Sequence, residues 1–325
     1  MGNVRGLTSL WKLNQNTPPS SSSFSPGGKV MACDNASCTK GDVVPFERTG
    51  PSATGMAAAE SPQLRQSWFP HRDSRTSGWL LTGNPIPVAV ITIAYVYFVK
   101  VAGPRWMRYR KPFDLRRWIL VYNFLTATLS LFFLIMFGKY AYWDNGYGVL
   151  QDVDYGGLPS SNKIVHLSWW FYLFRLSELT DTVFFVLRKK SNQVSTLHVF
   201  HHVVVSWNMW LSVTYGGQAH AMFITCMNSF VHVIMYTYYF LAALGPAYKE
   251  YLWWKKYLTM LQIVQFSLLL LHCLGTALAK GNYVPLFIWL SIAQALVFFV
   301  WFVMFYIRAY KIRCRITPPE PSKND

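Results

Sequence analysis

Long apolar stretches separated by short polar connections fill the chain beyond residue 84. Seven can be distinguished, at residues 85–101, 118–137, 165–187, 197–213, 219–244, 258–278 and 285–307. A helix needs about 20 apolar residues to cross the hydrocarbon core of a bilayer, and each stretch has that length or comes close to it. The pattern predicts an all-α membrane protein with seven transmembrane helices.

Two of these stretches are less typical of membrane spans than the others. Stretch 197–213 is short for a span and carries three histidines, and stretch 165–187 carries Arg175, Glu178 and Asp181. Charged groups are costly in hydrocarbon. We therefore expect these side chains to face an interior that is lined by protein or water.

The composition supports a membrane setting and separates the N-terminal part of the chain. Of the 325 residues, 52% are hydrophobic, 17% aromatic and only 14% charged, which is unusual for a soluble domain. Residues 1–80 are instead rich in Ser, Pro and Gly, without sustained apolar periodicity. We expect a disordered extension at 1–80, a seven-helix domain at 81–311 and a C-terminal tail at 312–325.

The net charge of +16 follows the connections between the apolar stretches. Those after the first, third and fifth stretches, together with the tail, hold seventeen Lys and Arg, and those after the second, fourth and sixth hold three. This asymmetry predicts a cytosolic C-terminus and an N-terminus on the other side of the membrane, and it argues against nucleic-acid binding. The basic connections either serve topology alone or also attract the phosphates of a CoA ester.

Polar residues recur at one depth in four of the predicted spans. At helical spacing they form single-sided stripes, which are Glu178 and Asp181; His198, His201 and His202; Asn228, His232, Tyr236 and Tyr239; and Thr259, Gln262 and Gln265. All four stripes fall in the predicted cytosolic half, Glu178 and Asp181 at roughly 10 to 15 Å from the edge. For Thr and Gln, hydrogen bonding between helices explains the pattern equally well. So many titratable groups at one depth favour a shared site.

These segments resemble the very-long-chain fatty acid elongases, which are membrane 3-oxoacyl-CoA synthases of the endoplasmic reticulum. The resemblance covers about residues 73–315 and rests on four motifs in order: RLSELTDT at 175–182, LHVFHH at 197–202, NSFVHVIMYTYY at 228–239 and TMLQIVQ at 259–265. The family usually has Lys where this chain has Arg175. The positive charge is kept, but a lysine amine that donated a proton would be lost.

The resemblance implies an acyltransferase that condenses a long-chain acyl-CoA with malonyl-CoA to give 3-oxoacyl-CoA, CO2 and CoA. It implies that six of the seven helices surround an acyl tunnel, closed at the lumenal end and open to the cytosol. It further implies residence in the endoplasmic reticulum membrane, with a lumenal N-terminus, no cofactor and no metal. Candidate partners are the reductases and dehydratase of the elongation cycle and a second copy of the chain.

The predicted site divides into catalytic and substrate-binding residues. The catalytic candidates are His198, His201, His202, Asn228, His232, Glu178 and Asp181. Neutral imidazole is a nucleophile and a proton shuttle, so His201 or a neighbouring histidine is expected to accept the acyl group. We expect His232 and Asn228 to act on the second substrate or the developing oxyanion, and Glu178 and Asp181 to fix histidine tautomers.

The substrate-binding candidates share a position near the cytosolic mouth. Within the spans they are Arg175, Thr182, Tyr236, Tyr239, Gln262 and Gln265, and in the basic connections they are Arg188, Lys189, Lys190, Lys255 and Lys256.

Two other classes of protein share parts of this pattern. A membrane metal-dependent fatty-acyl desaturase or hydroxylase also uses an HxxHH motif, but it needs about eight ligating histidines, and only four lie together here. A non-catalytic seven-span receptor or transporter shares the topology, yet it needs no such cluster of titratable groups. Both alternatives rank below the elongase.

Overall fold

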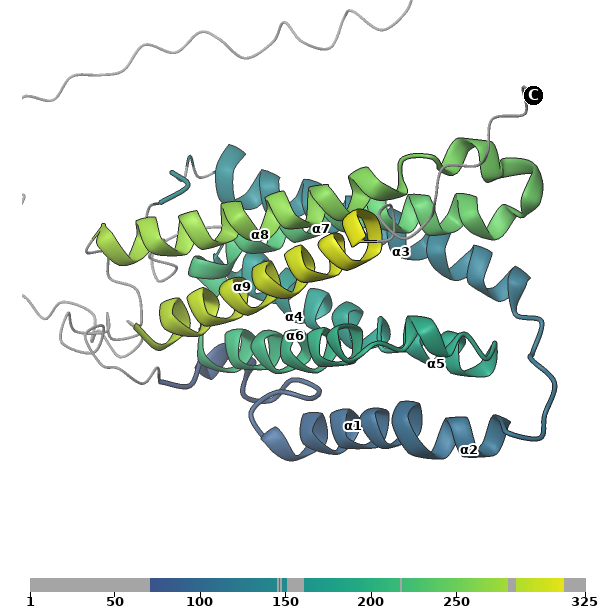
Figure 1. The fold of residues 1–325 in the computed structure, drawn as a ribbon. Helices are drawn as coiled ribbons and strands as arrows, with labels where there is room; N and C mark the ends of the chain where they lie inside the picture. The colour runs from purple at the N-terminus through teal and green to yellow at the C-terminus, as the bar shows by residue number, and fades with distance from the viewer. Residues whose placement is uncertain are drawn as a thin grey trace, which may run out of the picture. The chain divides into compact units, whose positions relative to one another are not determined.

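The computed structural model describes residues 71–144, 146, 148–150, 161–216, 218–279 and 285–312, all within one compact unit, 57–325. Helices are the only regular elements in these ranges (Figure 1). The main ones are α1 (Pro85–Tyr97), α2 (Gly103–Met107), α3 (Arg116–Phe137), α4 (Ser161–Ser177), α5 (Thr180–Leu187), α6 (Thr196–Tyr215), α7 (Gln218–Leu244), α8 (Lys255–Leu278) and α9 (Pro285–Tyr306). The predicted all-α class is confirmed for these residues.

Short helical segments join or extend the main helices. Three are π-helical: η3 (Phe98–Ala102) joins α1 to α2, η4 (Gly138–Trp143) extends α3, and η8 (Ile307–Ile312) extends α9. The 3-10 segments are η2 (Ser74–Thr76), η6 (Ser191–Gln193) and η7 (Pro246–Leu252). The sequence pattern predicted none of these segments.

Each predicted apolar stretch is helical, but the helices differ in their suitability as spans. Four are long and apolar enough to cross a membrane: Pro85–Met107, Arg116–Trp143, Glu250–Leu278 and Pro285–Tyr310. The other stretches form α4 with α5, α6 and α7, which carry all of the predicted catalytic residues. The structure therefore shows a helical protein with several candidate membrane spans, and it does not by itself establish seven.

Specific residues fix where the helices begin and end. Asn84 caps α1 by accepting a hydrogen bond from the backbone of Ile86, and Pro85 occupies the first turn, where its missing N–H is not needed. Gly216 ends α6 in a left-handed conformation with φ of +73°. At the end of α7, the Arg116 guanidinium donates hydrogen bonds to the carbonyls of Ala243 and Leu244.

Packing between the helices builds the interior in which the polar residues lie. Helix α3 runs along α7, α8 runs along α9, and α6 contacts both α1 and α4 (Figure 1). Phenylalanines dominate the contact between α3 and α4, where the rings of Phe133 and Phe171 are 5.0 Å apart. A second apolar cluster, centred on Phe266 and Phe298, joins α8 and α9 to α6 and α7. Burial of these large rings stabilises the bundle.

The segment before α1 is attached to the end of α6. The backbone N–H of Asp73 donates to the carbonyl of Thr214 over 2.9 Å, and the Thr76 hydroxyl donates to the carbonyl of Val213 over 2.9 Å. Trp79 stacks on His166 with ring centroids 4.5 Å apart. The described structure therefore begins before residue 81, where we expected the helical domain to start. Residues 1–70 of the predicted extension and residues 313–325 of the predicted tail lie outside the described residues.

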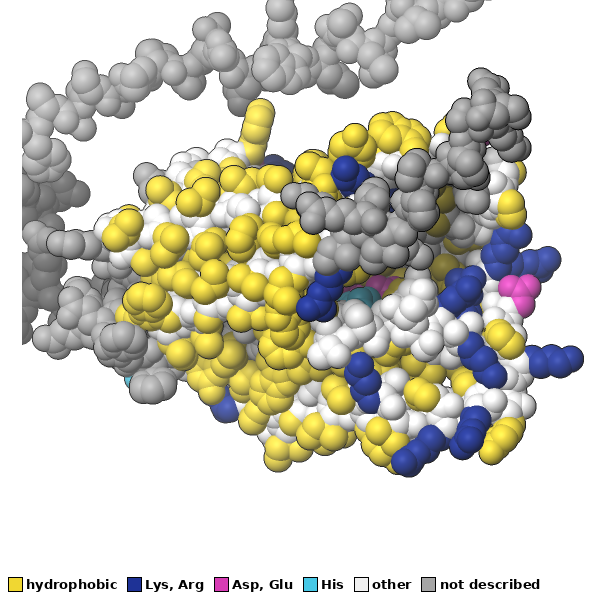
Figure 2. All heavy atoms as spheres, in the orientation of Figure 1, with side chains coloured by type: hydrophobic (Ala, Val, Ile, Leu, Met, Phe, Trp, Pro, Cys, Tyr) yellow, Lys and Arg dark blue, Asp and Glu magenta, His cyan; other side chains and the backbone are white. Residues whose placement is uncertain are grey.

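Charge is distributed unevenly over the surface. Lys and Arg side chains gather on the right of Figure 2, where Figure 1 places α2 and α5, and hydrophobic side chains cover much of the rest of this face. We call this the basic end, and its exposed cations include Arg105, Arg108, Arg110, Lys111, Lys189, Lys190, Lys255, Lys256 and Arg308. A histidine and an acidic side chain are visible in a hollow beside these cations (Figure 2).

Candidate active site

The histidine triplet occupies the first two turns of α6, at the basic end. The Ser195 side chain starts this helix by accepting a hydrogen bond from the backbone N–H of His198. The ring of His202 lies 4.5 Å from that of His198 and 5.5 Å from that of His201, centroid to centroid. The spacing therefore places the His202 ring beside both His198 and His201, as the single-face pattern predicts.

A buried ion pair links α4 to α7 beside these histidines. Arg175 Nη1 lies 2.7 and 2.9 Å from the two carboxylate oxygens of Glu178, and 2.7 Å from Nδ1 of His232. Arg175 and Glu178 are each 2% exposed and His232 is 6% exposed. The tight turn between α4 and α5 brings the Glu178 side chain back towards Arg175, three residues earlier. Because both side chains are removed from water, each charge needs the opposite charge beside it for stability.

The tautomer of His232 follows from this network. A guanidinium can only donate, so Nδ1 of His232 accepts the bond from Arg175, and we assign the proton of the neutral ring to Nε2. The 3.3 Å between Nδ1 and Glu178 Oε1 then separates two acceptors, and the 2.7 Å contact with Arg175 is the hydrogen bond. Glu178 thus orients His232 through Arg175.

Asp181 lies in a different set of contacts. Its Oδ2 accepts a 2.6 Å hydrogen bond from the Tyr236 hydroxyl of α7. The next residue, Thr182, is 2.7 Å from the Tyr95 hydroxyl of α1. These bonds hold α5 against two helices. The predicted role of Asp181 in fixing a histidine tautomer stays a prediction.

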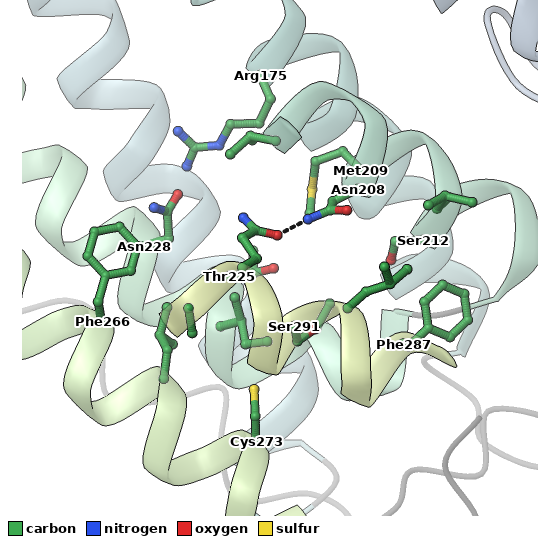
Figure 3. A pocket seen from close by; sticks show the side chains of 18 of the residues that line it. Arg175, Asn208, Met209, Ser212, Thr225, Asn228, Phe266, Cys273, Phe287 and Ser291 are labelled. Atoms are coloured by element: carbon green, nitrogen blue, oxygen red, sulfur yellow. Dashed lines mark hydrogen bonds between the residues drawn. The ribbon is translucent and has the colours of Figure 1, made fainter. Parts of the chain in front are cut away.

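A cavity of about 100 Å³ begins at Arg175 and His201 and continues between α4, α6, α7, α8 and α9 (Figure 3). Four predicted site residues line it, Arg175, His201, Asn228 and Gln265. The other lining side chains are mainly apolar, among them Phe171, Met209, Phe266, Leu269 and Phe287. Polar groups thus gather at one end of an otherwise apolar cavity, which is a common form of ligand site.

Several buried side-chain nitrogens near the cavity have no hydrogen-bond partner among the described residues. They are Nε and Nη2 of Arg175, Nε2 of Gln265 and Nε2 of His198. An unpaired buried donor costs about 1–3 kcal/mol, so such groups are usually satisfied by a ligand or by water. Arg175 and Gln265 line the cavity, so their free N–H groups can bind an acceptor oxygen there.

The remaining predicted residues surround this site. His202 is buried in contact with His201, the Tyr239 ring packs edge-on to Tyr236, and Gln262 donates to the sulfur of Met235 over 3.6 Å. The predicted cations are further out at the basic end, where they are Arg188, Lys189, Lys190, Lys255 and Lys256. The structure therefore separates an inner polar group from an outer basic one.

Sequence reasoning missed Asn208 and Gln294, which line the cavity and are joined by a hydrogen bond. Asn208 is seven residues after His201, two turns along the same face of α6, and that spacing was a usable signal. Gln294 follows Ser291 by one turn in the otherwise very apolar helix α9, which was a second signal. In the part of the chain that the structure describes, no group of three His, Cys, Asp or Glu side chains is arranged to hold a metal ion.

Comparison with known proteins decides the family. Residues 80–316 match the model of the GNS1/SUR4 (ELO) family. The chain belongs to this family. It is 41% identical to very long chain fatty acid elongase 7 of Rattus norvegicus over 248 residues, which are 75% of this chain and 88% of the rat protein.

Two further relatives of this chain carry similar names. Very long chain fatty acid elongase 1 of Homo sapiens is 40% identical over 249 residues, 76% of this chain and 89% of the human protein. Very long chain fatty acid elongase 7 of Drosophila melanogaster is 40% identical over 242 residues, 73% of each chain. The predicted membership of the elongase family is confirmed.

Proposed function

We propose that this GNS1/SUR4 protein condenses a long-chain acyl-CoA with malonyl-CoA at the polar end of the cavity, giving 3-oxoacyl-CoA, CO2 and CoA. Fatty acid elongation follows from the family and from the elongases that are its relatives. The observation that carries the proposal is the cavity itself. It places His201, Arg175 and Gln265 at one end of an apolar space that suits an acyl chain.

The first chemical step is acyl transfer to a histidine. A ring nitrogen of His201 attacks the thioester carbonyl, the carbon–sulfur bond breaks, and the CoA thiolate leaves and takes up a proton. During the attack, negative charge develops on the carbonyl oxygen. The unpaired N–H groups of Arg175 and Gln265 support a role in binding that oxyanion.

The second step forms the new carbon–carbon bond. Malonyl-CoA loses CO2, and the electron pair left on its carbon attacks the acyl carbonyl. The carbon–nitrogen bond to His201 then breaks, and the ring regains its free nitrogen. His232, with its proton on Nε2, is the candidate to orient the second substrate, and the Arg175–Glu178 pair supports that role by holding its ring in place.

Topology and location are part of the same proposal. We infer that α4 with α5, α6 and α7 also cross the membrane, giving seven spans, and that the basic end faces the cytosol. The cations of that end then bind the phosphates of both CoA substrates. The cavity forms part of an acyl tunnel in the endoplasmic reticulum membrane, where a homodimer and the other enzymes of the elongation cycle are candidate partners.

The covalent step has a direct test. Purified protein incubated with acyl-CoA but without malonyl-CoA should release CoA and gain the mass of the acyl group on a peptide that contains His201. The His201→Ala variant should show neither change. An intact-protein spectrum without the adduct, under conditions in which both substrates are turned over, would rule out the covalent route. A concerted condensation would then remain.

A further inference from the structure

The guanidinium of Arg175 keeps one edge free for a ligand. The N–H groups on Nη1 meet the Glu178 carboxylate and Nδ1 of His232, whereas Nε and Nη2 have no partner among the described residues. Because the guanidinium is planar, Nε–H and one N–H of Nη2 point in the same direction. Arg175 lines the cavity and is only 2% exposed, so an acceptor that enters the cavity can meet this edge away from bulk water.

The contacts of Arg175 hold the free edge in one orientation. Glu178 and His232 fix the opposite side of the guanidinium, and its carbon lies 4.4 Å from the centroid of the Phe171 ring and 5.3 Å from that of Phe174. Two parallel N–H donors match the two oxygens of a carboxylate, whereas a thioester carbonyl offers a single oxygen. Since the donors are already ordered, little side-chain freedom is lost on binding. The edge therefore suits a ligand with a free carboxylate.

The groups around the edge also favour a carboxylate. Among the described residues that line the cavity, none is Asp or Glu, and Arg175 is the only Lys or Arg. Gln265, whose Nε2 has no partner, adds a neutral donor. Figure 3 shows Arg175 and Asn228 together at one end of the cavity, away from Ser212 and Phe287. Of the two substrates in the proposed reaction, malonyl-CoA is the one that carries a free carboxylate close to its thioester.

We propose that the free Nε–Nη2 edge of Arg175 binds the carboxylate of malonyl-CoA and thereby selects this substrate. The inference rests on the proposed function, because it assumes that malonyl-CoA enters the cavity after the first CoA has left. An interaction that stabilises the carboxylate more than the transition state slows the loss of CO2. Glu178 balances the charge of Arg175, so the edge supplies well-placed hydrogen bonds with little net positive charge.

The loss of CO2 frees the same edge for the next event. The bond between the carboxyl carbon and the adjacent carbon breaks, and the electron pair stays on the adjacent carbon. As that carbon attacks the acyl carbonyl on His201, negative charge develops on the carbonyl oxygen, which takes the place of the departed carboxylate at Arg175. Binding of the carboxylate and binding of the oxyanion are therefore successive uses of one edge.

Binding is compared without turnover in the His201→Ala variant, which cannot form the acyl-enzyme. Titration calorimetry in detergent measures the dissociation constants of malonyl-CoA and of its amide analogue, in which an NH2 group replaces one carboxylate oxygen. The analogue has nearly the same size but offers a single acceptor oxygen, so it should bind roughly tenfold more weakly. Adding Arg175→Lys, which keeps the charge but not the two parallel donors, should reduce this ratio to roughly threefold or less.

Two further variants complete the comparison in the same His201→Ala protein. Arg175→Met combined with Glu178→Gln removes the edge without leaving an unpaired charge, so it should also reduce the ratio and serves if Arg175→Lys fails to fold. Met209→Leu is the matched control. It changes a side chain of the same cavity at nearly constant volume and should leave the ratio unchanged.

The outcomes separate this inference from the proposed function. Equal binding of malonyl-CoA and its amide analogue overturns the assignment of the carboxylate to Arg175. A ratio that keeps its full value in a folded variant without the edge also overturns it, because other groups would then recognise the carboxylate. If the unmodified protein elongates no acyl-CoA with malonyl-CoA, the proposed function itself fails.

Discussion

Arg175 connects a buried carboxylate, a buried histidine and an aromatic ring at the polar end of the cavity. It pairs with Glu178, donates to His232, and lies with its guanidinium carbon 4.4 Å from the centroid of the Phe171 ring. The remaining Nε and Nη2 edge has no partner among the described residues. A lysine ammonium could supply the charge at this position but could not serve Glu178, His232 and a ligand from a planar, forked group.

Loss of this charge should destabilise the protein. The Arg175→Met variant leaves the Glu178 carboxylate buried without a counter-charge, and removal of one partner from a buried pair costs about 3–5 kcal/mol. The thermal unfolding midpoint in detergent should fall clearly, and by less in Arg175→Lys. Combining Arg175→Met with Glu178→Gln should restore part of the loss, because neither charge is then unpaired. If the loss in the double variant equals the sum of the losses in Arg175→Met and Glu178→Gln alone, the two charges are not coupled.

For single residues, the sequence predicted which side chains share one face of a helix. It did not predict which side chains on different helices contact each other. The spacing of His198, His201 and His202 was enough to place three rings together, because helical periodicity fixes neighbours within one element. The bond between Asn208 and Gln294 joins residues 86 positions apart, and it depends on the register between two helices. Periodicity carries no information about that register, so the contact between Asn208 and Gln294 was not predicted.

The helices show local departures from regular α-geometry near the site. The predicted stretch 165–187 is one apolar run in sequence, but Glu178 and Leu179 form a tight turn between α4 and α5. The π-helical segment η3 changes the direction of side chains between α1 and α2. Such segments often occur at functional sites, and a hydrophobic pattern does not reveal them. The sequence thus predicted where helices occur and missed where they are interrupted.

The junction of α2 with α5 depends on a glycine. A Cβ at Gly103 would lie 2.7 Å from a methyl carbon of Val186 and 2.8 Å from the carbonyl oxygen of Phe98. We expect Gly103→Ala to lower the stability by about 1–3 kcal/mol, since overpacking forces side chains and backbone to shift. Thermal unfolding in detergent measures the effect. Gly138→Ala is a suitable control, because a Cβ there meets nothing within 4 Å, and an equal loss in both variants would contradict this explanation.

Across the whole molecule, the basic end, the buried polar residues and the cavity follow one another along the helix bundle. The cations lie on the surface, the histidines and the buried ion pair lie just inside, and the apolar cavity extends between the helices beyond them (Figures 2 and 3). A CoA ester has the same order of charged, reactive and apolar parts. Several polar stripes at one depth predicted this order in outline. All seven apolar stretches form helices, and four of these helices are long and apolar enough to cross a membrane.

Neutralising the basic end should weaken substrate capture more than chemistry. We expect the Lys255→Gln and Lys256→Gln double variant to raise the KM for acyl-CoA by roughly tenfold at low ionic strength, with little change in kcat. Added salt should reduce the difference, because exposed charges are screened. Steady-state kinetics at two salt concentrations measures both effects. Lys163→Gln, a change in an exposed cation at the other end of the bundle, should leave KM unchanged. A KM independent of charge at Lys255 and Lys256 would contradict capture by these cations.

The strap formed by residues 71–84 has a practical consequence for anyone shortening this chain. The family match begins at residue 80, which suggests a natural starting point for a trimmed protein. A chain trimmed there would lack the hydrogen bonds from the Asp73 backbone and the Thr76 hydroxyl to the end of α6. It would also lack the Trp79 ring, which stacks on His166 of α4. The carbonyls of Val213 and Thr214 would then need water as their partner. Purified material for crystallography or electron microscopy should therefore begin no later than residue 71.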